Sequence, residues 1–259
     1  MKDAWGRTIE YVRLSLTDAC NFCCPYCRPA EITPQSQHQL LSVDEWMTIL
    51  GAFHQVGVKA VRLTGGEPLL YPHIEELLAR IKQTGWFEDI SMTTNGSFLA
   101  PRAANLKELG LNRVNISLDS LDSDAFTLCV GKANQLDSVL NGIQSAIDAG
   151  FTSVKINTVL SRHWTDDEVH DLLHYVETWP VIWRFIEYMP FQGDAFHGPT
   201  FDEWKAQLER VSGGILTENH DVYGFGPATY YNLPSGKEIG FIFSMSHSYC
   251  DTCNRVRLT

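Results

Sequence analysis

Six of the seven cysteines in this 259-residue chain lie in two tight clusters. The first cluster comprises Cys20, Cys23, Cys24 and Cys27, and the second comprises Cys250 and Cys253. An odd total of seven cysteines, most of them clustered, in a chain whose first residues do not predict a signal peptide, favours metal ligation over a disulfide framework. Because thiolates are the usual ligands of iron–sulfur clusters, these residues indicate iron–sulfur chemistry.

Cys20, Cys24 and Cys27 supply three thiolates from one short loop. Structural zinc sites and ferredoxin clusters recruit four protein ligands, whereas three ligands leave one iron of a [4Fe–4S] cluster open to a substrate or cofactor. This C-x3-C-x2-C spacing, with Tyr26 before the last cysteine, resembles the signature of the radical S-adenosylmethionine (SAM) superfamily. Two alternatives stay open: ligation by Cys23 in place of Cys24, and a zinc knuckle completed by a distant residue. We prefer Cys24 because it keeps the superfamily spacing.

The second cluster is followed by alternating arginines. Cys250 and Cys253 form a C-x2-C pair, which by itself fits half a zinc ribbon, a redox pair or part of an iron–sulfur site. If the next residues are extended, Arg255 and Arg257 point the same way and suit a triphosphate or a carboxylate. Further cations lie within expected strands, among apolar neighbours: Arg13, Arg62, Lys155 and Arg184. In an acidic protein this set indicates an anion-binding interior, with internal salt bridges as the alternative.

Polar residues also follow the second, third and fourth expected strands. Gly65 and Gly66 permit a close backbone approach to a ligand, and the carboxylate of Glu67 can accept from an ammonium group. Thr93 ends the third strand and Ser117 the fourth. Each such loop alone is more often an ordinary turn or helix cap. Because active sites of α/β barrels lie at the carboxyl ends of the strands, we expect these residues to share one site with the cysteine loop.

The elements that must position these residues are short apolar runs alternating with helical patterns. We expect strands over residues 11–17, 60–64, 89–94, 113–118, 153–160 and 181–188, buried because both faces read as apolar. Helices are predicted over residues 73–82, 134–149 and 201–211, and after capping boxes that start at Ser42 and Thr165. The alternation predicts an α/β fold, an open or partial barrel, although a doubly wound sheet fits the periodicity nearly as well.

After residue 211 the pattern changes to short strand-like runs separated by glycine and proline. We therefore expect two domains, a barrel over residues 1–211 and a small C-terminal lobe over residues 212–259 that carries the second cysteine cluster. The net charge of −11 argues against a nucleic-acid partner. No apolar run approaches the length of a membrane span, so we expect a cytoplasmic protein without a membrane partner.

Over nearly its whole length the chain resembles the family of molybdenum cofactor biosynthesis protein A, the GTP 3′,8-cyclases. The most particular matches are residues 184–187 and 250–257. The resemblance implies a partial (β/α)6 TIM-like barrel, usually paired as a homodimer. It implies that GTP is converted to 3′,8-cyclo-7,8-dihydro-GTP through a 5′-deoxyadenosyl radical, with an external one-electron reductant.

The resemblance also implies the roles of individual residues. Cys20, Cys24 and Cys27 would bind the first [4Fe–4S] cluster, and Cys250 and Cys253 would belong to a second, whose third family cysteine lies further downstream than residue 259. The residues implied around SAM are Tyr26, Gly65, Gly66, Glu67, Ser117 and Met189. The residues implied to contact GTP are Arg13, Arg62, Thr93, Lys155, Arg184, Arg255, Val256 and Arg257.

Overall fold

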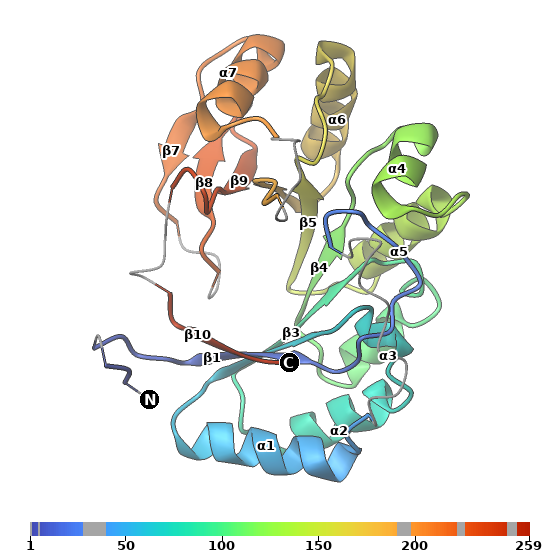
Figure 1. The fold of residues 1–259 in the computed structure, drawn as a ribbon, viewed down its shortest axis with the longest axis vertical. Coiled ribbons are helices and arrows are strands. Elements are labelled where there is room, and N and C mark those ends of the chain that lie inside the picture. Colours follow the sequence, from blue (N-terminus) through green and yellow to red (C-terminus); the bar gives the residue numbers. More distant parts are fainter. Residues whose placement is uncertain (1, 5, 28–39, 191–197, 222–225, 248–252) are drawn as a thin grey trace.

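Strands and helices alternate along most of the chain, and the strands assemble into one curved sheet (Figure 1). The computed structural model describes residues 2–4, 6–27, 40–190, 198–221, 226–247 and 253–259. The first six strands are β1 (Tyr11–Ser15), β2 (Ala60–Thr64), β3 (Asp89–Thr94), β4 (Arg113–Ser117), β5 (Ser153–Val159) and β6 (Ile182–Ile186). All six predicted strands are thus confirmed, with ends shifted by at most two residues.

The helices lie on the outside of the sheet (Figure 1). They are α1 (Val43–Gln55), α2 (Ile74–Thr84), α3 (Ala103–Glu108), α4 (Ser123–Val130), α5 (Leu136–Asp148), α6 (Asp166–Thr178) and α7 (Phe201–Ser212), with a 3-10 turn η1 (Pro68–Leu70). The capping boxes predicted at Ser42 and Thr165 are confirmed, and a third at Thr200 opens α7. The short helices α3 and α4 were not predicted, because they carry too few turns for a clear apolar period.

The strand order decides between the two architectures that the sequence left open. Strands β1 to β6 are parallel neighbours in chain order, without the reversal of a doubly wound sheet. The sheet curves as an open barrel (Figure 1). The partial-barrel prediction is therefore confirmed.

The C-terminal segment extends this sheet at both edges. Strand β9 (Glu238–Ile242) pairs in parallel with β6, and β8 (Thr229–Asn232) and β7 (Thr217–Asn219) follow it as antiparallel strands. At the opposite edge β10 (Arg255–Leu258) pairs in parallel with β1. These strands and the barrel strands share one ten-stranded sheet, so the division at residues 211 and 212 stays a prediction.

The two faces of the sheet differ in chemistry. On β2, Val61 and Leu63 are fully buried in the core, whereas Arg62 between them points to the other face. Trp183 and Phe185 on β6 pack in the same core, with Arg184 between them. The prediction that both strand faces are apolar is wrong, because the inner face of the barrel carries polar and charged side chains. In the described parts of the chain, no helix is long and apolar enough to cross a membrane.

The close packing of α5 depends on Gly142. A Cβ atom there would lie 2.3 Å from the carbonyl oxygen of Gly96, in the loop after β3. We expect Gly142→Ala to lower the free energy of unfolding by about 1–3 kcal/mol, as overpacking of a rigid contact does. Urea unfolding followed by circular dichroism measures this, with the exposed neighbour Asn141→Ala as control. Equal stability of the two variants would contradict the packing argument.

Candidate active site

The loop that carries Cys20, Cys24 and Cys27, here called the cysteine loop, follows β1 and lies directly against the loop after β2. The backbone amides of Gly66 and Glu67 donate to the carbonyl oxygens of Thr17 and Ala19, at 2.6 and 2.7 Å. A Cβ atom on Gly65 would lie 2.5 Å from the Thr17 oxygen, and one on Gly66 would lie 2.3 Å from the Ala19 oxygen. The two glycines therefore let the loop after β2 contact the start of the cysteine loop. The sequence predicted a close backbone approach to a ligand at these glycines, and in the structure the close approach is to the cysteine loop.

Glu67 fastens the same loop to the end of β3. The residue is completely buried, and its carboxylate accepts from the Leu69 amide, the Thr94 hydroxyl and the Asn95 amide at 2.7–3.0 Å. Burial raises the pKa of this carboxyl, and the donated hydrogen bonds oppose that rise. The structure thus gives Glu67 a positioning role, and its contact with a cofactor ammonium stays a prediction.

Three further contacts fix the rest of the cysteine loop. Asn95 donates to the Asn21 side chain at 2.8 Å, and its amide nitrogen lies 3.9 Å from the sulfur of Cys20. The hydroxyl of Tyr26 donates to Asp119 at 2.5 Å, and Asp119 also accepts from the Val159 amide at 2.8 Å. The loop is therefore tied to the ends of β2, β3 and β4, and through Asp119 to the end of β5. Burial raises the pKa of Asp119 to about 6, although the Tyr26 hydrogen bond opposes this.

Burial and the charges of Cys20 and Cys27 affect the pKa of the Cys24 thiol. Burial raises the pKa of Cys24 to about 12, and the negative charges of Asp119, Cys27 and Cys20 add to this effect. Cys23 is exposed and contacts the end of α4. Its backbone amide donates to Val130 at 2.9 Å, and its Cβ atom lies against Gly131 at the end of α4. This arrangement supports the predicted set with Cys24.

The donor set fits an iron–sulfur cluster better than a single metal ion. Within the described residues, no three His, Cys, Asp or Glu side chains gather around one point as a lone ion requires. Thiolates around a four-iron cluster are spaced more widely, and Cys20 and Cys24 are half-buried while Cys27 is exposed. Soft thiolate donors suit such a cluster. These residues would hold it.

Next to Tyr26 the rim contains a cavity of about 330 Å³. Its lining residues come from the cysteine loop, α4 and the segments after β5 and β6: Pro25, Tyr26, Leu128, Cys129, Ser161, Arg162 and Tyr188. The predicted residue Met189 follows Tyr188 and is 52% exposed, with its sulfur accepting from the Ser244 hydroxyl at 3.2 Å. Thr93 and Ser117 lie half-buried at the same carboxyl ends of the strands.

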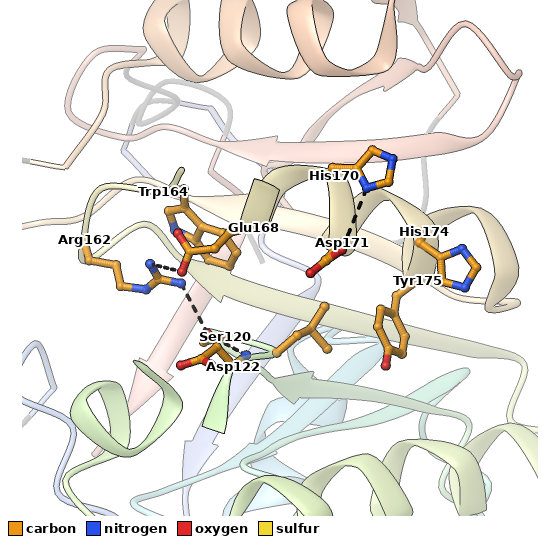
Figure 2. Close-up of a pocket in the computed structure, with 10 residues that line it drawn as sticks. Ser120, Asp122, Arg162, Trp164, Glu168, His170, Asp171, His174 and Tyr175 are labelled. Atoms are coloured by element: carbon orange, nitrogen blue, oxygen red, sulfur yellow. Dashed lines mark hydrogen bonds and ion pairs between the residues drawn. The ribbon is translucent and has the colours of Figure 1, made fainter. Parts of the chain in front are cut away.

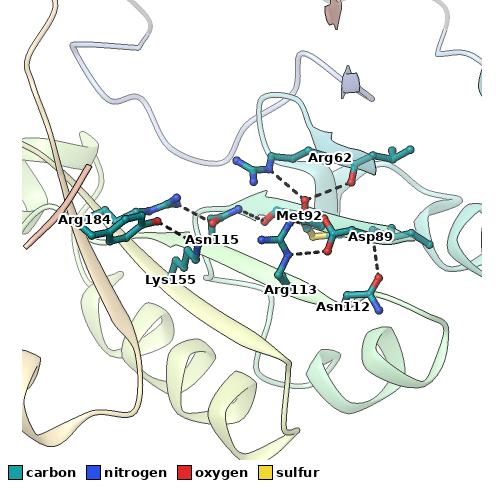
Figure 3. Close-up of polar contacts among 12 residues, drawn as sticks. Arg62, Asp89, Met92, Asn112, Arg113, Asn115, Lys155 and Arg184 are labelled. Atoms are coloured by element: carbon teal, nitrogen blue, oxygen red, sulfur yellow. Dashed lines mark hydrogen bonds and ion pairs between the residues drawn. The ribbon is translucent and has the colours of Figure 1, made fainter. Parts of the chain in front are cut away.

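Below this rim the inner face carries a row of cations. Arg62, Arg113, Lys155 and Arg184 lie along it from β2 to β6 (Figure 3). Arg113 forms an ion pair with Asp89. Among the described residues, Arg13, Arg62 and Arg184 have no such carboxylate partner within 4.0 Å. The row therefore holds more positive charge than the nearby acids balance.

The pKa values of these cations reflect the excess of positive charge on the inner face. Burial and the charge of Arg257 lower the pKa of Arg13 to about 10. Burial and the charges of Arg184, Arg113 and Arg62 lower the pKa of Lys155 to about 7. Burial lowers the pKa of Arg184 to about 10. Each cation is less stable than in water, so an anionic ligand in the barrel would stabilise all of them.

Strand β10 adds the two predicted arginines to this row. Arg255 is the register partner of Tyr11, and Arg257 is the partner of Arg13. Partners in a parallel pair share a face, so the prediction that both arginines point the same way is confirmed. Val256 points to the opposite face, and its predicted role at the substrate stays a prediction. Cys253 is half-buried just before the strand, whereas Cys250 lies outside the described residues.

Sequence reasoning missed several residues of the site. Asn115 and Asn157 accept from the guanidinium of Arg184 at 2.7–3.0 Å. Tyr230 on β8 contacts Lys155. The asparagines could have been found, because polar residues recur at every second position of β4 and β5. Tyr230 had no such local signal.

A separate cavity of about 440 Å³ lies between the loop after β4 and helix α6 (Figure 2). Arg162 there pairs with Glu168 at 2.8 Å and donates to Ser120 at 3.2 Å. The histidines His170 and His174 lie on the exposed side of α6. None of the predicted site residues lines this cavity, and its principal cation already has a carboxylate partner, so we place the active site inside the barrel.

The open barrel and its three-cysteine loop define the class of the protein: it belongs to the radical SAM superfamily, whose family model matches residues 14–176. Residues 181–259 match the Molybdenum Cofactor Synthesis C family. More narrowly, the chain belongs to the family of the GTP 3′,8-cyclases. It is 41% identical to GTP 3′,8-cyclase 2 of Pseudomonas aeruginosa over 99% of this chain and 78% of that protein. It is 39% identical to the GTP 3′,8-cyclase of Moorella thermoacetica over 100% of this chain and 81% of that protein.

Solved structures support the fold. Streptococcus suis SuiB bound to S-adenosylmethionine superposes with a TM-score of 0.62 at 19% identity, covering 80% of this chain and 46% of that chain. Methylornithine synthase superposes with a TM-score of 0.60 at 17% identity, covering 80% of this chain and 63% of that chain. The [4Fe–4S] cluster and SAM are the cofactors of this class of enzyme, as the sequence predicted.

The cluster ligands can be tested by paired cysteine variants. We expect Cys24→Ala to abolish the first cluster, because two thiolates do not hold it, and Cys23→Ala to leave it intact. Iron and sulfide per chain after anaerobic reconstitution, together with the spin-resonance signal of the reduced cluster on adding SAM, measure the outcome. Both variants carry Cys253→Ala, so that the second cysteine cluster does not contribute iron. Loss of the cluster in Cys23→Ala and retention in Cys24→Ala would reassign the ligand.

Proposed function

We propose that this protein converts GTP to 3′,8-cyclo-7,8-dihydro-GTP by radical SAM chemistry, in the biosynthesis of the molybdenum cofactor. The relatives that match the chain over 99–100% of its length are GTP 3′,8-cyclases. The observation that carries the proposal is the row of buried and half-buried cations on the inner face of the barrel. A triphosphate is the part of GTP that such a row suits, since it brings several negative charges at once.

In this proposal the chain's own residues bind and orient. Cys20, Cys24 and Cys27 hold the cluster at the rim, and the cavity beside Tyr26 takes the adenosyl part of SAM. Arg13, Arg62, Lys155, Arg184, Arg255 and Arg257 fix the triphosphate deeper in the barrel. When bound, the cluster and SAM would supply the radical chemistry that removes a hydrogen atom from the ribose. Fixing the nucleotide at several phosphate oxygens limits which hydrogen can be reached.

Several further assignments belong to the proposal. Cys250 and Cys253 contribute to a second cluster, and Cys253 is half-buried two residues before Arg255, the first residue of β10. An external one-electron donor reduces the first cluster, and the enzyme acts as a homodimer. None of the described cysteines forms a disulfide, which suits the reducing conditions of the cytoplasm.

Turnover tests the proposal directly. After anaerobic reconstitution, GTP, SAM and dithionite should give 5′-deoxyadenosine and the cyclised nucleotide in equal amounts, as measured by mass spectrometry. GTP deuterated at C3′ should transfer deuterium to 5′-deoxyadenosine, and the Cys24→Ala variant should do neither. Formation of 5′-deoxyadenosine with GTP unchanged would assign the enzyme to another substrate.

Binding measurements distinguish the residues that contact GTP from those that contact SAM. We expect Arg257→Ala to weaken GTP binding about tenfold, since charge-assisted hydrogen bonds contribute about 1.5–3 kcal/mol, and to leave SAM binding unchanged. Calorimetry under anaerobic conditions measures both affinities. Arg210→Ala is the matched control, because Arg210 is an exposed arginine on α7 that pairs with Asp166 at 2.6 Å. Equal GTP affinity in Arg257→Ala and the parent protein would refute the assignment.

A further inference from the structure

Tyr230, Gly240 and Arg184 form a row across three neighbouring strands. Gly240 on β9 is the register partner of Arg184 on β6 and of Tyr230 on β8. The three residues therefore share the inner face of the sheet. Arg184 and Tyr230 are 3% and 4% exposed, so both side chains lie almost entirely inside the protein.

The phenol of Tyr230 joins two cations of the row. The ammonium group of Lys155 donates to the Tyr230 hydroxyl at 3.3 Å and lies 5.7 Å from the centre of its ring. The charge of Arg184 also acts on this phenol: burial raises the pKa of Tyr230, and the nearby guanidinium opposes that rise. A neutral oxygen thus holds two like charges beside each other, where their mutual repulsion would otherwise separate them.

Gly240 makes this contact geometrically possible. A Cβ atom there would lie 2.8 Å from Cγ of Arg184 and 3.0 Å from Cε1 of Tyr230. The two long side chains therefore meet over a position that has no side chain of its own. On the other side of Arg184, the amide oxygens of Asn115 and Asn157 complete its hydrogen bonds. All of these acceptors are uncharged, so they orient the guanidinium without neutralising it.

We propose that Tyr230 is a positioning residue that holds Lys155 and Arg184 together as one anion-binding pair for the triphosphate of the substrate. The inference rests on the proposed function for the identity of the anion. It assigns to a strand of the C-terminal segment a role in the geometry of cations that come from β5 and β6. Tyr230 acts through these two side chains.

The pair makes nucleotide binding dependent on pH. The charged groups that face Lys155 are Arg184, Arg113, Arg62 and Asp89, with the phenol of Tyr230 on β8. Because burial and three cations lower the pKa of Lys155 to about 7, a large fraction of the free protein has a neutral Lys155 at pH 8. A bound anion raises that pKa, so binding takes up a proton, and affinity falls as pH rises above about 7.

The test is Tyr230→Phe, which keeps the ring over Gly240 and removes the oxygen. Without this acceptor the charged form of Lys155 is less stable, and Arg184 loses one contact. We expect GTP affinity at pH 7.5 to fall about tenfold, since hydrogen bonds to charged groups are among the strong ones. Calorimetry in two buffers of different ionisation enthalpy should show more protons taken up per GTP than in the parent protein. SAM affinity should not change.

Tyr231→Phe is the matched control. Tyr231 is the next residue of β8 and points to the opposite face, where its ring packs against Phe201 and Phe241 at 5.9 and 5.2 Å. The Tyr231→Phe variant also loses a phenol hydroxyl from β8, so a general loosening of β8 would appear in both variants. The inference predicts parent-like GTP affinity and proton uptake for Tyr231→Phe.

Unchanged GTP affinity and proton uptake in Tyr230→Phe would overturn the inference. If the parent protein binds no GTP, the proposed function fails, and the same comparison is made with inorganic triphosphate. Weaker triphosphate binding in Tyr230→Phe than in the parent then still supports the positioning role. If the parent protein binds neither anion, the inference is wrong as well.

Discussion

The inner face of this barrel concentrates positive charge that its own carboxylates do not balance. Asp89 pairs with Arg113, but among the described residues the buried guanidinium of Arg184 has no carboxylate partner and donates to the amide oxygens of two asparagines. Burial of such groups lowers their pKa values and opposes folding, so the arrangement is stable only because the apolar outer face of the same strands supplies a large core. The interior is therefore organised for an anion that enters from outside, at a cost in stability that the core offsets.

The conformation of the cysteine loop depends on contacts with neighbouring segments. The loop has no regular secondary structure, so the ends of β2 to β5 fix it through backbone amides, the buried carboxylate of Glu67 and the Tyr26–Asp119 hydrogen bond. Gly66 brings the two loops into direct backbone contact, and Gly142 lets α5 press on the loop after β3. The thiols are thus positioned by the sheet rather than by their own loop, and the row of cations lies on the same sheet.

Local patterns predicted the elements, and long-range pairing decided what the sequence could not. The capping boxes at Ser42 and Thr165 and the six strands depend on residues close in sequence, so they were predictable. The polar inner face was also visible in the alternation around Lys155, although it was interpreted as apolar on both sides. The contact between Lys155 and Tyr230 joins residues 75 positions apart and depends on β8 lying beside β9. No local period carries that information.

Both ends of the sheet contribute to the row of cations, and this follows from where the C-terminal strands pair. Strand β10 returns to β1 and places Arg257 beside Arg13, while β9 and β8 extend the far edge and bring Tyr230 to Lys155. The contact between Lys155 and Tyr230 links a residue matched by the radical SAM family with one matched by the Molybdenum Cofactor Synthesis C family. An enzyme of this superfamily needs its barrel for the cofactor. Here the C-terminal strands complete the part of the barrel that would recognise the substrate, so specificity and cofactor chemistry share one sheet.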